Sequence, residues 1–317
     1  MGNFFDCSPK KLPPVIQNLV SKTERSMVRM KYVEGKNLSL TNSKIGGLGY
    51  IPATANHPTA KDGAMLVMLL QLNFSEIAEV IDDPDLVALL PSQGLLQVFI
   101  DVRNYGFGMS NSYSDRPFPS DSYQVRFWED VSLPVNVEAL DAYLSIIEVI
   151  GGEHMSRHQK YMTPMDMRKP LGIDFTQETQ SVHPSCIEYE RLDDDLKLPP
   201  IEQLIEETAA TINAIDAWWF YHDELQMEYP ENVLYTYGYD EISNRGGSQV
   251  LGYPDFAQGD TRIYNKEISD HILLFQLDSD MEKSVMWGDC GTAHFFIRPK
   301  DLAIADFSRL AYYWDCT

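Results

Sequence analysis

The chain lacks the short motifs that identify most nucleotide-binding proteins and hydrolases. It contains neither the G-x-x-x-x-G-K nor the G-x-G-x-x-G phosphate-binding pattern, and the G-x-S-x-G nucleophile elbow is missing. Its four cysteines, Cys7, Cys186, Cys290 and Cys316, are scattered and form no C-x-x-C pair, which argues against a disulfide framework or a zinc knuckle. We therefore expect free, buried thiols and no cofactor.

Long hydrophobic runs are missing too. Although 44% of the residues are hydrophobic, no run of about eighteen apolar residues occurs, so the sequence predicts a large core and no membrane span. The segment from Met1 to Lys11 is polar and is not followed by the apolar stretch of a secretory signal. We expect a cytoplasmic protein.

Basic residues are few compared with acidic ones. The 25 Lys and Arg residues face 47 Asp and Glu residues, which gives a formal net charge of −22. This charge would repel phosphate backbones and anionic lipids, whereas it would attract a basic peptide or protein over a long range. The same balance also simply keeps many proteins in solution. The sequence thus disfavours nucleic acid and membranes as partners, favours a peptide or protein partner, and leaves the oligomeric state open.

What the chain does contain is a pattern that occurs twice, about 200 residues apart. Gln71 and Gln276 lie 205 residues apart, and Gly94 and Gly291 lie 197 apart, so the intervals agree to within one loop. The first copy comprises Ser43-Lys-Ile-Gly-Gly-Leu48, Leu66–Leu72 and Gly94–Ile100, and the second comprises Arg245-Gly-Gly247, Ile272–Asp278 and Gly291–Ile297. We expect one domain over residues 1–317, built of two related halves (about 27–130 and 235–317) and a helical, loop-rich connection (131–234).

Hydrophobic periodicity supports a mixture of strands and helices. Alternating or continuous apolar residues predict strands at 27–33, 66–72, 95–102, 123–128, 271–277, 291–298 and 310–314. Helical spacing predicts helices near 12–20, 75–81, 137–150, 199–219 and 299–305, with Ser75 as a capping residue. Because strands and helices do not alternate strictly, we predict an α+β fold with mixed or antiparallel sheets, flanking helices and pseudo-two-fold halves. The polar segment 153–198 follows no pattern that fixes its course.

Two glutamines and two pairs of glycines are candidate binding residues. Gln71 and Gln276 sit in apolar strands, where an unpaired amide would cost a few kcal/mol, so each should bond to nearby backbone or to a ligand. The glycines, Gly46-Gly47 and Gly246-Gly247, form loops that often approach a ligand closely. We expect a cleft between the halves, lined by these loops, that receives an extended segment of a partner.

Trp287 and Asp289 are further candidates in the segment Trp287-Gly-Asp-Cys-Gly291. Their side chains either line a pocket, or Trp287 fills the core while Asp289 caps the turn. The alternative function is a metal-dependent or hydrolytic enzyme. It would use His154 and His158, which have helical metal-ligand spacing, His183, or the acidic stretch from Asp278 to Asp289, which otherwise is a solvated turn.

Read in order, several segments resemble the YwqG-like family of uncharacterised bacterial proteins. The resemblance covers about Ser8 to Thr317 and rests on Ser43-Lys-Ile-Gly-Gly47, Leu69–Leu72, Leu90-Pro91, Gly94-Leu-Leu96, Leu251-Gly-Tyr-Pro254, Leu273–Asp280, Trp287-Gly-Asp289, Phe295-Phe-Ile297 and Asp306-Phe-Ser308. The family usually has Trp-Pro after the first glycine loop, where this chain has His57-Pro58.

This resemblance implies an internally duplicated α+β fold with no established enzyme activity. More remotely, the family is similar to the programmed cell death protein two group, whose members are chaperones of a ribosomal protein. The resemblance also suggests bacterial relatives that bind peptides or proteins, including as immunity proteins against secreted toxins. It thus favours binding over catalysis.

Overall fold

The computed structural model divides the chain into two compact units, each made of two chain segments. One comprises residues 1–25 and 179–246, and the other comprises 26–178 and 247–317. The residues that the structure describes are 14–35, 37–103, 106–109, 117–150, 161–183, 186–198, 200, 203 and 244–317. Both copies of the repeated pattern, apart from Arg245 and Gly246, belong to the second, larger unit.

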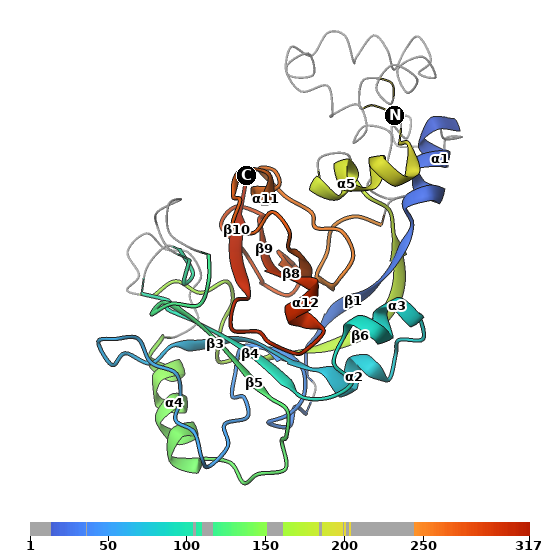
Figure 1. Ribbon diagram of the computed structural model, residues 1–317. Helices are drawn as coiled ribbons and strands as arrows, with labels where there is room; N and C mark the ends of the chain where they lie inside the picture. The colour runs from blue at the N-terminus through green and yellow to red at the C-terminus, as the bar shows by residue number, and fades with distance from the viewer. Residues whose placement is uncertain are drawn as a thin grey trace, which may run out of the picture. The chain divides into compact units, whose positions relative to one another are not determined.

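Ten strands of the described residues form one sheet, which is predominantly antiparallel (Figure 1). The strands are β1 (Arg25–Val33), β2 (Lys44–Ile45), β3 (Val67–Asn73), β4 (Leu95–Ile100), β5 (Tyr123–Trp128), β6 (Leu171–Gln180), β7 (Gln249–Val250), β8 (Ile272–Asp278), β9 (Thr292–Ile297) and β10 (Ala311–Asp315). Their order is β10-β9-β8-β7-β1-β6-β2-β3-β4-β5, so β1 and β6 are central and a four-stranded ladder lies on either side.

The described residues also form helices, of which the first and the fifth belong to the smaller unit. They are α1 (Pro14–Thr23), α2 (Phe74–Ala78), α3 (Pro84–Leu89), α4 (Val137–Ile150), α5 (Ile187–Leu196), α11 (Thr261–Tyr264) and α12 (Pro299–Leu302). Figure 1 shows α2 and α3 beside β6, and the Gln177 side chain of β6 bonds to Asp82 between these two helices. Sheet and helices together make the fold mixed α+β. No helix among the described residues is long and apolar enough to cross a membrane.

The two outer ladders pair in the same register. In the first, Gln71 of β3 lies opposite Lys44 and Gln97, and a bulge interrupts β3 between Met68 and Leu70. In the second, Gln276 of β8 lies opposite Gln249 and His294, and a bulge interrupts β8 between Leu273 and Phe275. Positions of one ladder therefore have counterparts in the other. Since β6 lies beside β2 and β1 beside β7, we use first half below for β6 with β2–β5 and second half for β1 with β7–β10.

Helix α4 covers one face of the first ladder. Its buried Tyr143 and Ile147 pack against Met68 and Phe99 of β3 and β4. At the bulge, the Met68 N–H, which leaves the regular ladder, donates to the Tyr143 hydroxyl at 2.8 Å. The sequence favours this helix because its apolar residues recur at helical spacing.

An aromatic core joins the two ladders on their other face. Tyr123 of β5 packs against Phe295 and Tyr312, with ring centroids 6.2 and 5.1 Å apart. The Tyr312 hydroxyl donates to the carbonyl of Phe107 at 3.0 Å, and the Tyr123 hydroxyl donates to that of Leu310 at 3.2 Å. Each ladder therefore buries its inner face and satisfies its tyrosine hydroxyls against the other.

Most predicted strands agree with the structure, and the segment 153–198, whose course the sequence left open, forms regular elements where the structure describes it. It contributes β6 at the centre of the sheet and α5, because Leu171, Ile173 and Phe175 alternate with polar residues and point into the core. The capping residue of α2 is Asn73 rather than Ser75, since its side chain accepts from the Ser75 N–H. Most of the helix predicted at 199–219 lies outside the described residues.

Candidate functional site

The Gln71 amide is fully buried and makes four hydrogen bonds. Its Oε1 accepts from the Tyr50 N–H at 3.0 Å and from Gln97 Nε2 at 2.7 Å. Its Nε2 donates to the carbonyls of Leu40 and Asn42, both at 2.8 Å. Gln71 therefore holds the chain on both sides of β2 in place. Of the two roles expected for it, bonding to nearby backbone is the one that these contacts fill.

Gln97 extends this network across β4. Its Nε2 also donates to the Tyr50 carbonyl at 2.7 Å, and its Oε1 accepts from the Trp128 indole at 2.7 Å. Gly49 lies against the two amides, and a Cβ there would stand 2.8 Å from Gln71 Oε1. The loop thus approaches the strands so closely that only glycine fits at this position.

Gln276 has the same role in the second ladder. Its Oε1 accepts from the Asp255 N–H at 3.0 Å, and its Nε2 donates to the Gly247 carbonyl at 2.7 Å. His294 takes the position of Gln97, and its Nε2 donates to the Asp255 carbonyl at 2.6 Å. Burial lowers the pKa of His294 to about 4, so the ring is neutral near pH 7.

Lys44 and Gln249 are the counterparts on β2 and β7. Lys44 is buried, and its Nζ donates to the carbonyls of Ser39 (2.5 Å) and Leu48 (2.9 Å). Burial lowers its pKa to about 8, and the carboxylate of Glu76 opposes this shift. Gln249 Nε2 instead donates to the carbonyls of Leu251 and Tyr253.

These bonds correct the pairing of the glycine loops. The Gly46 N–H donates to the Leu69 carbonyl, and the Leu251 N–H donates in the same way to that of Leu274. Both Gly46 and Leu251 have a positive φ, as do the residues that follow them, Gly47 and Gly252. The counterparts of Gly46-Gly47 are therefore Leu251-Gly252. Gly246-Gly247 corresponds instead to the chain just before β2.

Neither glycine pair presents free backbone in the way the sequence suggested. The Gly47 N–H donates to the Met167 carbonyl, and a Cβ on Gly47 would stand 2.7 Å from the Pro170 ring. The Gly247 N–H donates to Asp278 Oδ2 at 2.8 Å. The glycines thus permit close packing. The structure brings Gly46 and Gly47 near Gln71, and Gly247 near Gln276, as two separate groups.

Trp287 and Asp289 do not share a pocket. Trp287 is 1% exposed and packs edge-on against Phe107 with ring centroids 5.4 Å apart, as its core interpretation requires. Its indole Nε1 has no hydrogen-bond partner among the described residues. Asp289 is exposed, and its backbone carbonyl accepts from Thr317.

The residues of the enzyme alternative are not gathered into a site where they are described. Asp278 accepts from the Ser279 N–H and the Thr292 hydroxyl, in addition to Gly247, so it closes a turn. His183 is buried in the smaller unit, and burial, with Arg245 second, lowers its pKa. His154 and His158 lie outside the described residues. Within the described part of the chain, no group of three or more His, Cys, Asp or Glu could hold a metal ion.

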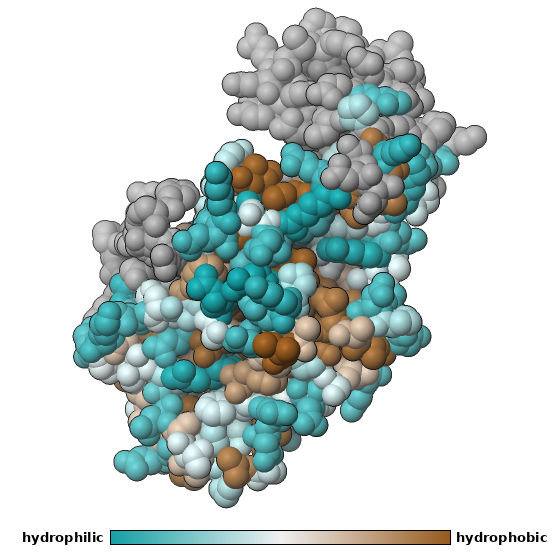
Figure 2. Space-filling model, viewed as in Figure 1, coloured by the Kyte–Doolittle hydropathy of each residue, from teal (hydrophilic) through white to brown (hydrophobic). Residues whose placement is uncertain are grey.

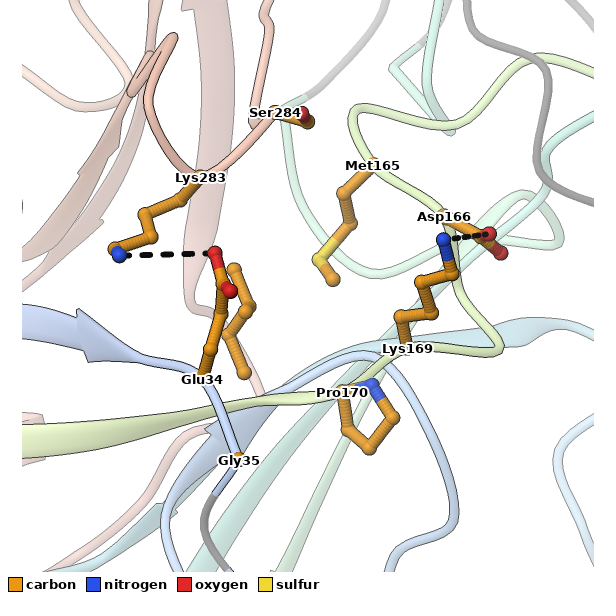
Figure 3. Close-up of a pocket in the computed structure, with 9 residues that line it drawn as sticks. Glu34, Gly35, Met165, Asp166, Lys169, Pro170, Lys283 and Ser284 are labelled. Carbon is orange, nitrogen blue, oxygen red and sulfur yellow. Dashed lines mark ion pairs between the residues drawn. The ribbon is translucent and has the colours of Figure 1, made fainter.

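A hollow of about 470 Å³ lies between the two halves, and we call it the inter-half pocket (Figure 3). Two ion pairs flank it, Lys283–Glu34 at 3.6 Å and Lys169–Asp166 at 3.9 Å. Met165, which also covers Gly46, projects between them. Because each lysine already has a carboxylate beside it, this lining has no strong preference for a ligand of one charge.

A second hollow, of about 500 Å³, lies between α2 and β6, and we call it the acidic pocket. Glu76 and Asp174 line it together with Asn42, Ser43, Val80 and Phe175. Of the described residues that line it, none is a lysine or arginine. Asn42 Nδ2 donates to Glu76 Oε1 at 2.6 Å, and the Ser43 N–H donates to Oε2 at 2.9 Å, so the carboxylate is held in one orientation.

The corresponding place in the second half is built differently. Gln249 and Lys44 are counterparts, and they pair with Arg29 of β1 and Gly172 of β6. Three residues further along these strands, Tyr32 of β1 therefore corresponds to Phe175 of β6. The Tyr32 hydroxyl lies 2.7 Å from the Ser248 hydroxyl, so the two side chains meet. Met281 and Lys31 stand where the first half has Glu76 and Asp174. The second half thus has no carboxylates at the two matching positions, although burial raises the pKa of Tyr32 and the nearby Asp278 and Asp280 raise it further. The paired carboxylates of the first half were not visible in the sequence.

Both outer ladders lie in a region that matches a known family model, whereas the pocket residues Glu34 and Asn42 precede that region. A search among curated proteins finds no match. The model of the domain of unknown function DUF1963 matches residues 43–316, from β2 to the end of β10. The match covers most of the chain, and the chain therefore belongs to this family of unknown function.

Proposed function

We propose that this protein is a binding protein and that its acidic pocket receives a lysine or arginine side chain of a basic peptide or protein partner. The observation that carries this proposal is the pairing of two carboxylates, Glu76 and Asp174, with an apolar wall in one hollow. A long basic side chain needs both features, because its stem is apolar and only its end is charged.

The lining suits each part of such a side chain. Val80 and Phe175 offer apolar surface to the methylene stem, and the Phe175 ring can also attract a cation. Glu76 is preoriented by Asn42 and Ser43, and each of its oxygens accepts one bond in the hydrogen-bond scheme, which leaves each a second lone pair for an ammonium or guanidinium group. Little reorganisation is therefore needed on binding.

The charge of the whole chain supports the same class of partner. A formal charge of −22 attracts a basic partner over a long range and raises the rate of encounter. The face of the described residues seen in Figure 2 is mostly hydrophilic, with small and separate hydrophobic areas. Recognition on that face would therefore depend on charge and hydrogen bonds more than on a broad apolar interface.

We also infer that the two halves arose by internal duplication, as in the YwqG-like family that the chain resembles. The matching registers, bulges and glutamine bonds of the two ladders support this inference. After duplication the second half would have closed its hollow with the Tyr32–Ser248 contact, while the first half kept an open one. Toxin immunity and chaperoning of a basic protein are two uses of such a site.

The proposal is tested with a fluorescent peptide of alternating glycine and lysine, and with the same peptide carrying norleucine in place of lysine. Norleucine keeps the apolar stem and removes the charge. We expect the lysine peptide alone to bind, with an affinity that falls as salt is raised.

Two variants then separate the pocket from the general charge. Glu76→Gln should weaken binding of the lysine peptide about tenfold, because one charge-assisted bond in the pocket is lost. Glu282→Gln, on an exposed residue beside Met281, removes the same charge from the second half and should change the affinity less than twofold. Equal effects of the two variants would contradict a site in the acidic pocket.

A further inference from the structure

The last strand ends against the turn that contains Trp287 and Cys290. The Thr317 N–H and hydroxyl both donate to the Asp289 carbonyl, at 3.2 and 2.7 Å. The turn itself is closed by the Gly291 N–H, which donates to the Trp287 carbonyl at 2.8 Å. The residues beside this contact, Cys290 and Cys316, are both cysteines.

The Cys316 side chain lies directly on the turn. A Cβ on Gly288 would stand 2.7 Å from Cys316 Sγ, and a Cβ on Gly291 would stand 2.7 Å from the Cys316 Cβ. Only glycine on both sides of Cys290 permits this approach. The turn therefore packs against Cys316. Cys290 is part of this turn and carries a second thiol.

The hydrogen bond from Thr317 N–H to the Asp289 carbonyl brackets the two cysteines. The last pair of the β9–β10 ladder is Thr292 and Asp315, so the same register places Cys316 opposite Gly291, the residue that follows Cys290. Disulfides join α-carbons that are roughly 4.4 to 6.8 Å apart. Residues on both sides of Cys290 contact Cys316 or Thr317, so the backbone brings the two cysteines close together at this turn.

The two thiols differ in exposure. Cys290 is exposed, Cys316 is partly exposed, and Cys186 is buried in the other unit. Buried thiols were expected, so the expectation holds for Cys186 and is wrong for Cys290; Cys7 lies outside the described residues. An oxidant in solution reaches Cys290 first.

We propose that Cys290 and Cys316 form a reversible intramolecular disulfide when the protein meets hydrogen peroxide. The Cys290 thiolate attacks one peroxide oxygen, which gives a sulfenic acid and releases hydroxide. The Cys316 thiolate then attacks the Cys290 sulfur, forms the S–S bond and expels the second hydroxide. The two protons lost by the thiols convert the two hydroxides to water, so two thiols are oxidised and one peroxide is reduced.

The full-length protein, treated with stoichiometric hydrogen peroxide and then with iodoacetamide, tests this site by peptide mass spectrometry. We expect one cross-linked peptide pair that contains Cys290 and Cys316 and disappears on treatment with dithiothreitol. Cys290→Ser and Cys316→Ser should abolish it, whereas Cys186→Ser should leave it unchanged. The oxidised protein should also unfold at a temperature several degrees higher, because the cross-link restrains the unfolded chain.

Two results would overturn the proposal. One is the accumulation of sulfinic acid on Cys290 in the wild-type protein with no cross-link to Cys316. The other is a cross-link that forms only between two molecules, seen as a covalent dimer of wild type and of Cys316→Ser alike. Neither result would bear on the acidic pocket, which uses different residues.

Discussion

The two outer ladders of the sheet share a hydrogen-bond scheme but differ in the side chains that complete it. In both, a buried glutamine accepts from the N–H of the facing loop, through Tyr50 in one and Asp255 in the other. In both, a serine hydroxyl accepts from the N–H of the last residue of the strand that carries the glutamine. Ser43 accepts from Asn73 of β3, and Ser248 accepts from Asp278 of β8. The comparison shows that the two ladders have the same backbone geometry, whereas the polar side chains that bond to this backbone differ between them.

The exchanged side chains change the local electrostatics. Gln97 is replaced by His294, which adds a titratable group, and Lys44 is replaced by Gln249, which removes one. Each half nevertheless has a mostly buried cation near this position, because Arg29 of β1 lies opposite Gln249 and reaches its Oε1 at 3.4 Å. The charge is thus kept while the strand that carries it changes.

The halves differ most at the hollow beside the central strands. The first half has Glu76, Asp174 and Phe175, and the hollow is open. The second half has Tyr32 bonded to Ser248 in the corresponding place. Two halves that match in backbone but differ at this place are what we expect of a protein that binds through one half only.

The largest effect should follow from removing the central glutamine of each ladder. Gln71→Ala leaves the Tyr50 N–H without its acceptor, removes one of the two acceptors of Gln97 Nε2 and opens a cavity, so we expect a loss of about 4 kcal/mol in the free energy of unfolding. Gln276→Ala breaks two bonds rather than four, and we expect about 2 kcal/mol. Urea denaturation measures both. A larger loss for Gln276→Ala would refute this ranking of the two networks.

A smaller effect concerns pH and His294. Its pKa is lowered from 6.5 to about 4, so between these values the unfolded state binds more protons and stability falls as the pH falls. This contribution amounts to about 3 kcal/mol at pH 4. In His294→Gln, which copies Gln97, the wild-type loss between pH 6.5 and 4 should shrink by this amount. Unfolding curves at several pH values measure it, and unchanged pH dependence would show that His294 does not titrate as proposed.

The smallest effect concerns Lys44. Its pKa is lowered from 10.5 to about 8, so the unfolded state binds more protons between these values and stability gains with rising pH. Lys44→Gln copies Gln249 and should remove this gain, which is on the order of 1 to 2 kcal/mol once relaxation around the buried ammonium offsets part of its desolvation. The difference in stability between variant and wild type from pH 8 to 10.5 is the measured quantity. A constant difference would contradict a neutralised Lys44.

Part of this fold was accessible from the sequence because the repeated strands are strongly apolar. The segments around Gln71 and Gln276 predicted β3 and β8, and the intervals between copies predicted matching elements. The glycine loops misled, since Gly246-Gly247 resembles Gly46-Gly47 in composition and in its positive φ angles, whereas the hydrogen bonds to the sheet match Gly46 with Leu251. A leucine with positive φ is unusual enough that composition does not predict it.

The acidic pocket was not predictable in the same way. Glu76 follows β3 and Asp174 lies on β6, and they line one hollow only because β6 enters the centre of the sheet. The segment that contains β6 alternates apolar and polar residues, and this period was the available signal. Non-local contact of that kind depends on the whole sheet order rather than on local sequence.

The central claim is that one half binds and its counterpart does not, and photo-cross-linking locates the bound side chain directly. The probe is the glycine-lysine peptide with a photoreactive group on one lysine, and adducts are mapped by mass spectrometry. We predict adducts on α2 and β6, near Glu76, Val80 and Phe175. Adducts concentrated near Met281 and Tyr32, or spread over the surface without preference, would contradict the account.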